Sequence, residues 1–200
     1  MLTEYSTYDD IRKFRDKASA KFNDMIKGHL GKAIRRKKLE WKKIKSENRQ
    51  PFYHKFRLDG QELEVLVLPI ENEYGRLKDD GFFCNVFTFV DTNNGKTLYE
   101  FLPNKKTITI SSPHYIKRNK ERHVYEHGIK YSENFPYIRN GRKYELVVCG
   151  ENVIVCRRVD DDIMIYITLL TKDMCTSNNF QSIFAQAGKV IDEHDIYEWK

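Results

Sequence analysis

A short basic segment carries the residues of this chain best suited to chemistry. His114, Arg118 and Arg122 are spaced four residues apart, so they share one face of any helix formed there. An imidazole can exchange a proton near neutral pH, and two guanidiniums beside it can neutralise charge developing on a phosphate. This pattern is typical of phosphodiester cleavage or of anion binding without cleavage. The structural alternative pairs both arginines with carboxylates and packs His114 against a sheet.

The residues before and after this segment predict the elements that position it. Ser112-Pro113 indicates a helix start, because serine caps free backbone amides and proline fits the first helical turn. We expect that helix to end near His123, with Lys117 and Lys120 beside the face that carries His114 and both arginines. A loop with Gly128, Pro136 and Asn140-Gly141 follows. Three β-rich runs then predict an antiparallel meander at 144–149, 152–158 and 163–170.

A basic His/Arg helix followed by such a meander resembles the barnase, colicin and RelE-type group of small metal-independent ribonucleases. The resemblance covers about residues 106–187. The site residues that it implies are His114 as the acid/base group, Arg118 and Arg122 as the clamp on the transition state, and Thr168 and Gln181 as polar groups facing the substrate. The alternative for Thr168 and Gln181 is an ordinary polar position on a sheet or helix.

Positive charge is concentrated in the first third of the chain. The formal net charge is +6, yet residues 1–57 hold 17 Lys and Arg against 7 Asp and Glu, so that part is +10 and the remainder is −4. Clustered cations favour a polyanionic partner, because attraction to phosphates depends on local charge density. We expect nucleic acid, RNA rather than DNA, or an acidic protein surface; a solvated helix face is the alternative.

The densest cations lie between Lys32 and Arg49, where 9 Lys and Arg stand against 2 Glu. This segment and the 114–123 helix supply the candidate nucleic-acid-binding residues. They are Lys32, Arg35, Arg36, Lys37, Lys38, Lys42, Lys43, Lys117 and Lys120.

An amphipathic helical pattern begins the chain. Apolar residues recur at spacings of three and four from Tyr8 to Ile34 and continue through Trp41 and Ile44, with Thr7 as the expected N-cap. The pattern fits one long helix or two helices that break near Gly28-His29-Leu30-Gly31. That glycine segment also resembles the GxxG loop with which KH domains clamp a nucleotide backbone, although no convincing strand precedes it.

Two hairpins are expected after the helical region. Asp59-Gly60 divides the β-rich segment 52–69, and Thr92-Asn93-Asn94-Gly95 separates the next pair of runs. A short strand follows at 106–110. The fold class predicted is therefore α+β, with a basic helical arm or hairpin at 1–50 and an α+β domain at 51–200. A final helix near Met174–Val190 is expected to close it.

Several function classes have no support in the residues. The four cysteines contain no C-x-x-C pair, His123 and His127 lack the Glu of an H-E-x-x-H motif, and there is no P-loop or nucleophile elbow. We therefore expect no metal and no cofactor. The absence of a long apolar run or secretory signal predicts a cytoplasmic protein that does not enter a membrane.

These features lead to two functional expectations. The first is a nucleic-acid-associated basic protein, with metal-independent ribonuclease activity at His114 as its enzymatic form. The second is a non-enzymatic assembly or interaction protein of a larger complex, such as a phage particle component or a toxin-neutralising partner. In that case the amphipathic N-terminal helix would dock onto a neighbour or onto another copy.

Overall fold

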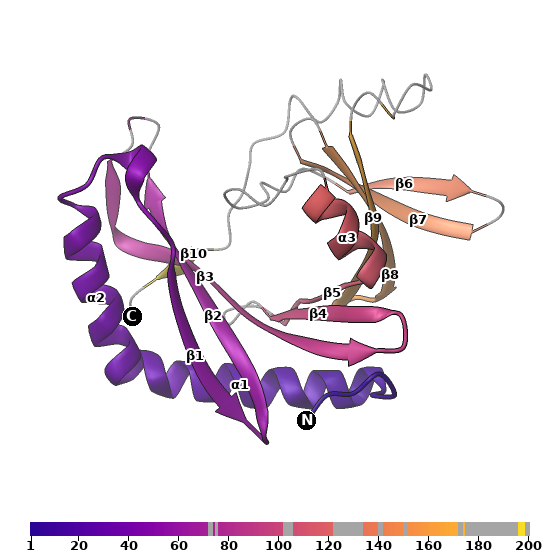
Figure 1. The fold of residues 1–200 in the computed structure, drawn as a ribbon, viewed down its shortest axis with the longest axis horizontal. Coiled ribbons are helices and arrows are strands. Elements are labelled where there is room, and N and C mark those ends of the chain that lie inside the picture. Colours follow the sequence, from indigo (N-terminus) through magenta and orange to yellow (C-terminus); the bar gives the residue numbers. More distant parts are fainter. Residues whose placement is uncertain are drawn as a thin grey trace. The chain divides into compact units, whose positions relative to one another are not determined.

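The computed structural model describes residues 1–71, 74, 76–101, 106–121, 134–139, 142–149, 152–171, 174 and 196–198, and these form an α+β fold as predicted. The helices are α1 (Tyr8–Lys27), α2 (His29–Trp41), the short 3-10 helix η1 (Ser46–Asn48) and α3 (Pro113–Glu121) (Figure 1). The strands are β1 (Phe52–Leu58), β2 (Gln61–Glu71), β3 (Leu77–Thr92), β4 (Gly95–Phe101), β5 (Ile108–Ser111), β6 (Asn134–Arg139), β7 (Arg142–Cys149), β8 (Asn152–Asp160), β9 (Ile163–Thr171) and β10 (Ile196–Glu198).

The chain divides into two compact units. Unit 1 consists of Met1–Asp91, Tyr99–Ile108 and Asp195–Lys200, and unit 2 of Thr92–Leu98 and Thr109–His194. The two N-terminal helices therefore belong to the same unit as the first strands. None of the described helices is long and apolar enough to cross a membrane.

The N-terminal helical pattern forms two helices. Thr7 caps α1 as expected, because its hydroxyl accepts a hydrogen bond from Asp10 N at 3.2 Å and the Asp10 carboxylate accepts one from Thr7 N at 3.0 Å. Gly28 ends α1 with its N–H bonded to Met25 O, and α2 begins at the next residue. In Figure 1, α2 turns steeply away from α1 at this point.

The sheet of unit 1 follows the predicted hairpins. β1, β2 and β3 are antiparallel neighbours in that order, and β10 also pairs with β3. Asp59 (φ 50°) and Gly60 (φ 80°) turn β1 into β2, as a two-residue hairpin requires. Alternate residues of β2, such as Leu63, Val65 and Val67, are buried on one face.

Helices α1 and α2 pack within unit 1 through their apolar stripe. Their buried apolar residues are Ile11, Phe14, Ala18, Phe22, Met25, Ile26, Leu30, Ile34 and Trp41. Phe14 packs on Phe101 with ring centroids 6.0 Å apart, and α2 packs on β1 and β2. Tyr8 and Ile44, at the two ends of the predicted stripe, are instead exposed. The rest of the stripe contributes to the core of unit 1.

Unit 2 contains the expected meander with an extra strand. The order is β5-β9-β8-β7-β6, and β7, β8 and β9 are antiparallel neighbours. The sequence interpretation of 134–139 as part of a loop was wrong, since β6 forms there opposite β7. Pro136 suggested a loop, but β6 is the last strand in the order and proline is tolerated on an edge strand. The helix expected near Met174–Val190 lies almost wholly outside the described residues.

Candidate nucleic-acid interface

One face of α2 is fixed against the sheet of unit 1. Leu30, Ile34 and Trp41 are at most 1% exposed and recur at helical spacing. Since α2 packs on β1 and β2 with this stripe, its opposite face is directed to solvent. The packing thus fixes which of the many basic residues of α2 reach the surface.

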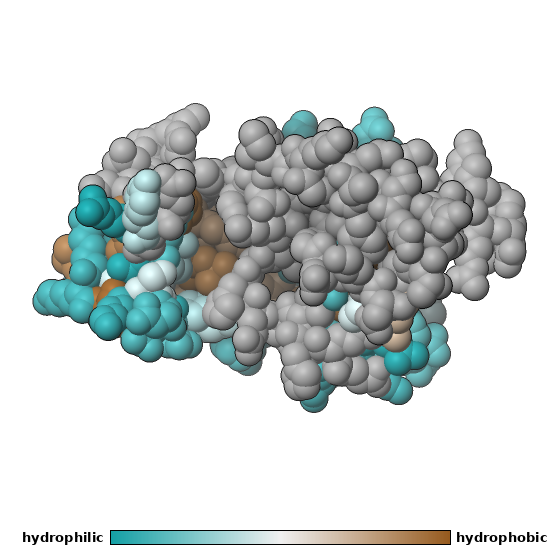
Figure 2. Space-filling model, turned by 90° about the horizontal axis from the view of Figure 1, so that it is seen from above, coloured by the Kyte–Doolittle hydropathy of each residue, from teal (hydrophilic) through white to brown (hydrophobic). Residues whose placement is uncertain are grey.

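The solvent side of α2 is strongly basic. We call Lys32, Arg35 and Arg36 of α2, together with Lys42 and Lys43 directly after its end, the cationic face of α2; all five are exposed. Leu39, 61% exposed, lies among them. Figure 2 shows mostly hydrophilic side chains, with apolar ones between them, at its left, where α2 lies in Figure 1.

Three members of the cationic face are not paired with a carboxylate in the described part of the chain. Lys32, Arg36 and Lys43 make no ion pair with any residue that the structure describes. Like charges gathered on one helix face repel each other, and a bound anion relieves that repulsion. Within the cationic face, these three side chains are therefore the ones that a bound anion would stabilise most.

The C-terminal end of α2 is held by Arg49. Its guanidinium Nε donates to Trp41 O at 2.9 Å and to Ile44 O at 3.1 Å, and its Nη1 lies 2.5 Å from Glu71 Oε1. The indole Nε1 of Trp41 donates to Gln50 O at 2.9 Å. A cation that binds the last carbonyls of a helix stabilises its end. Arg49 therefore positions the cationic face and does not belong to it.

Other cations of the first third are also engaged in structure. Arg15 is buried, with its guanidinium bound to Asp16 and to the backbone carbonyl of Lys106. Lys37 pairs with Glu40 at 3.0 Å. The +10 balance of residues 1–57 consequently overstates the charge that a partner would meet, and the candidates Lys37 and Lys38, both half-buried, are less accessible than the cationic face.

The glycine segment does not form a loop between helices. Gly28 is the single residue between α1 and α2, whereas Gly31 is buried inside α2. A KH-type clamp needs both glycines in a loop that approaches the nucleotide backbone. The resemblance to KH domains was therefore wrong, because the helical pattern continues through Gly31.

Helix α3 begins as its sequence predicts. The hydroxyl Oγ of Ser112 accepts a hydrogen bond from Tyr115 N at 3.1 Å and itself donates to Ile167 O at 3.0 Å. Pro113 occupies the first helical position. The capped helix start is therefore tied to β9, and this fixes which side of α3 faces the sheet.

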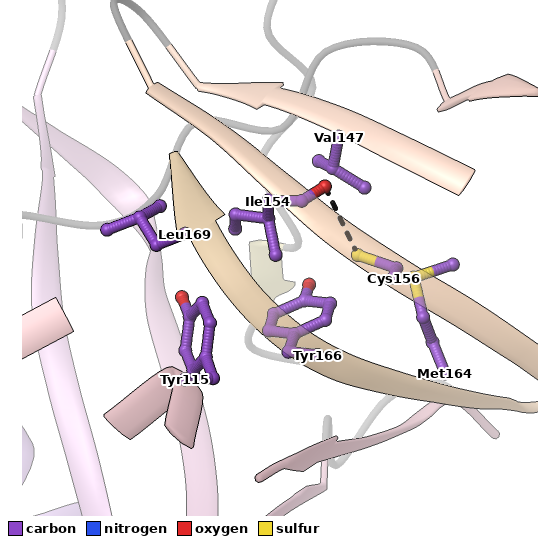
Figure 3. Close-up of a cluster of buried hydrophobic side chains, with 7 residues drawn as sticks. All are labelled: Tyr115, Val147, Ile154, Cys156, Met164, Tyr166 and Leu169. Atoms are coloured by element: carbon purple, nitrogen blue, oxygen red, sulfur yellow. Dashed lines mark hydrogen bonds between the residues drawn. The ribbon is translucent and has the colours of Figure 1, made fainter. Parts of the chain in front are cut away.

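The inward side of α3 is anchored by Tyr115. Its ring packs on Tyr166 with centroids 5.3 Å apart, next to Leu169 and Ile154, within a buried cluster (Figure 3). Val147, Cys156 and Met164 complete that cluster. His114 is exposed and Arg118 is half-buried on the same side of α3, with Lys117 and Lys120 also exposed. The structure thus places His114 and Arg118 on one side of α3, as expected for the first two of the three residues spaced four apart.

Thr168 lies apart from that pair. Tyr166 and Leu169 are three residues apart in β9, so in a regular strand they would face opposite sides of the sheet. Both face the α3 side here, because the pairing of β9 with β8 shifts register between Val155 and Cys156. Thr168 directly precedes Leu169 and therefore points to the opposite face. Arg122 and Gln181, the remaining predicted members, lie outside the described residues.

Two pairs of residues escaped the sequence reasoning. The rings of His29 and His54 lie 5.5 Å apart, and Asn85 Nδ2 donates to Glu100 Oε1 at 2.8 Å. Burial raises the pKa of Glu100 to about 7, and the hydrogen bond from Asn85 opposes that shift. Members of each pair are 25 and 15 residues apart, so no local spacing could have shown them. Among the described residues there is no group of three or more potential metal ligands.

Comparison with known proteins adds no relative. No family model, curated protein or solved structure matches the chain.

Proposed function

We propose that this protein binds nucleic acid through the cationic face of α2, chiefly by contacts to phosphates. The observation that supports this most is the division of α2 into a side fixed by Leu30, Ile34 and Trp41 and an opposite side with exposed Lys and Arg, which continues into two exposed lysines directly after the helix. Such a rigid row of cations releases counterions when it meets a polyphosphate. RNA is the preferred ligand, with DNA as the comparison.

The test reverses charge on the three cations that lack an ion pair in the described part of the chain. The variant Lys32→Glu/Arg36→Glu/Lys43→Glu is compared with the natural protein by fluorescence anisotropy on labelled RNA and DNA over a series of salt concentrations. We expect the loss of about three phosphate contacts to weaken binding at least tenfold at low salt and to flatten the salt slope by about 2 to 3.

A matched control separates this face from net charge. Lys13, Lys27 and Lys106 are exposed cations of unit 1 outside α2, so Lys13→Glu/Lys27→Glu/Lys106→Glu has the same net charge as the test variant. The control should bind within about threefold of the natural protein. Equal weakening in both variants, or no binding at low salt, would contradict the proposal.

Ribonuclease activity at α3 is a second candidate, favoured by the exposed His114 beside Arg118 on one side of the helix. In it, His114 transfers the proton and Arg118 stabilises charge on the phosphate. RNA is incubated in chelator with the natural protein, His114→Ala and Arg118→Ala. Cleavage that both variants lose supports the activity, and equal cleavage by all three indicates a contaminant.

The assembly alternative has lost part of its basis. It depended on apolar surface of the N-terminal helices, but most of that stripe is buried within unit 1. Mass measurement in solution tests it directly: a monomer of 23.9 kDa argues against assembly through these helices.

A further inference from the structure

Two histidines from different elements of unit 1 converge beside the sheet. His29 is the first residue of α2, and His54 lies in β1 opposite Val65, on the buried side of the strand pair. Their ring centroids are 5.5 Å apart and the ring planes are inclined by 55°. The packing of α2 on β1 holds the two elements together.

This separation agrees with two imidazoles bound to one metal ion. A Zn–N bond of about 2.1 Å places the ion about 3.2 Å from each ring centre, and a tetrahedral angle then puts the centres about 5.2 Å apart. The observed 5.5 Å differs from that by only a few tenths of an ångström.

We propose that His29 and His54 form a two-ligand site for a divalent transition metal such as Zn²⁺ or Ni²⁺. Imidazole suits these ions, and water completes the coordination, since no third His, Cys, Asp or Glu joins the pair among the described residues. Affinity should be weaker than at a closed structural zinc site with four protein ligands. Metal binding at this pair would not require the nucleic-acid binding proposed above.

The experiment titrates untagged natural protein with ZnCl₂ and with NiCl₂ by isothermal titration calorimetry. His29→Ala removes an exposed side chain and should leave the fold intact, whereas His54→Gln removes the half-buried ligand. Each variant should lose one binding event of the natural protein, or show at least tenfold weaker binding for it. Electron paramagnetic resonance of bound Cu²⁺ should show two nitrogen ligands that fall to one in His29→Ala.

His114→Ala is the matched control, because it removes an exposed histidine from α3. It should retain the binding event that the other variants lose. An isotherm of His29→Ala that matches the natural protein, or the absence of any binding event in the natural protein, overturns the proposal. Circular dichroism of each variant shows that a loss does not arise from unfolding.

Discussion

Helices α2 and α3 are both short, basic and amphipathic, yet they present their charges differently. α2 and the two residues after it carry five exposed cations opposite a stripe that is almost wholly buried, and Arg49 holds the C-terminal end of the helix. α3 presents His114 and Arg118 on one side, while Thr168 faces away across the sheet. The difference shows that a row of cations needs only one well-packed helix, whereas a catalytic group needs side chains from several elements to converge.

The largest effect should come from removing the anchor of α2. Trp41→Ala deletes a side chain that is 1% exposed and a hydrogen bond to Gln50, so we expect a loss of about 3 to 5 kcal/mol in the free energy of unfolding. Urea denaturation followed by circular dichroism measures it. Leu39→Ala, at an exposed position of the same helix, should change stability by no more than about 0.5 kcal/mol. Equal losses would show that α2 is not packed as described.

The stability of the protein should depend on pH through Glu100, which lies in unit 1. Because burial raises the pKa of Glu100 to about 7, the folded chain holds this proton more tightly than the unfolded chain does. Its contribution to stability is fully present below the ordinary carboxyl pKa and is lost as pH rises through about 7. Relative to Glu100→Gln, the natural protein should lose up to about 3 kcal/mol between about pH 5 and pH 8. Parallel stability profiles for the two proteins would refute this.

Substitution of Arg49 tests whether this cation of the basic segment stabilises the fold. Arg49→Ala removes the bonds to Trp41 O and Ile44 O and leaves the half-buried Glu71 unpaired, so unfolding should become easier by about 2 kcal/mol. Lys32→Ala removes the same charge from the cationic face and should leave stability nearly unchanged. If the two variants proved equally stable, Arg49 would not be the cap of α2.

The smallest effect should follow charge reversal on α3. Lys117→Glu/Lys120→Glu changes two exposed cations of the second basic helix. If binding depends on the cationic face of α2, affinity for RNA should fall by less than about threefold at moderate salt, because salt screens exposed charges that make no direct contact with phosphates. Anisotropy measured beside the α2 variant decides it. A loss as large as that of the α2 variant would place α3 in the interface.

Local signals in the sequence were sufficient for most elements. Thr7 and Ser112 marked helix starts because each has a hydroxyl that caps free amides, and Asp59-Gly60 marked a hairpin because its turn requires positive φ. Pro136 misled because proline usually signals a loop, while its tolerance on an edge strand depends on the order of strands. That order is a property of the whole sheet.

The α+β class, the amphipathic N-terminal stripe and the concentration of positive charge can be read from the sequence, because each depends on neighbours along the chain. Which cations reach solvent depends on tertiary packing, which buries Arg15 and uses Arg49 as a cap while leaving Lys32, Arg36 and Lys43 exposed. It also brought His29 to His54 and turned Thr168 away from His114. Packing on a sheet sets these relations between distant residues, and no local spacing encodes them.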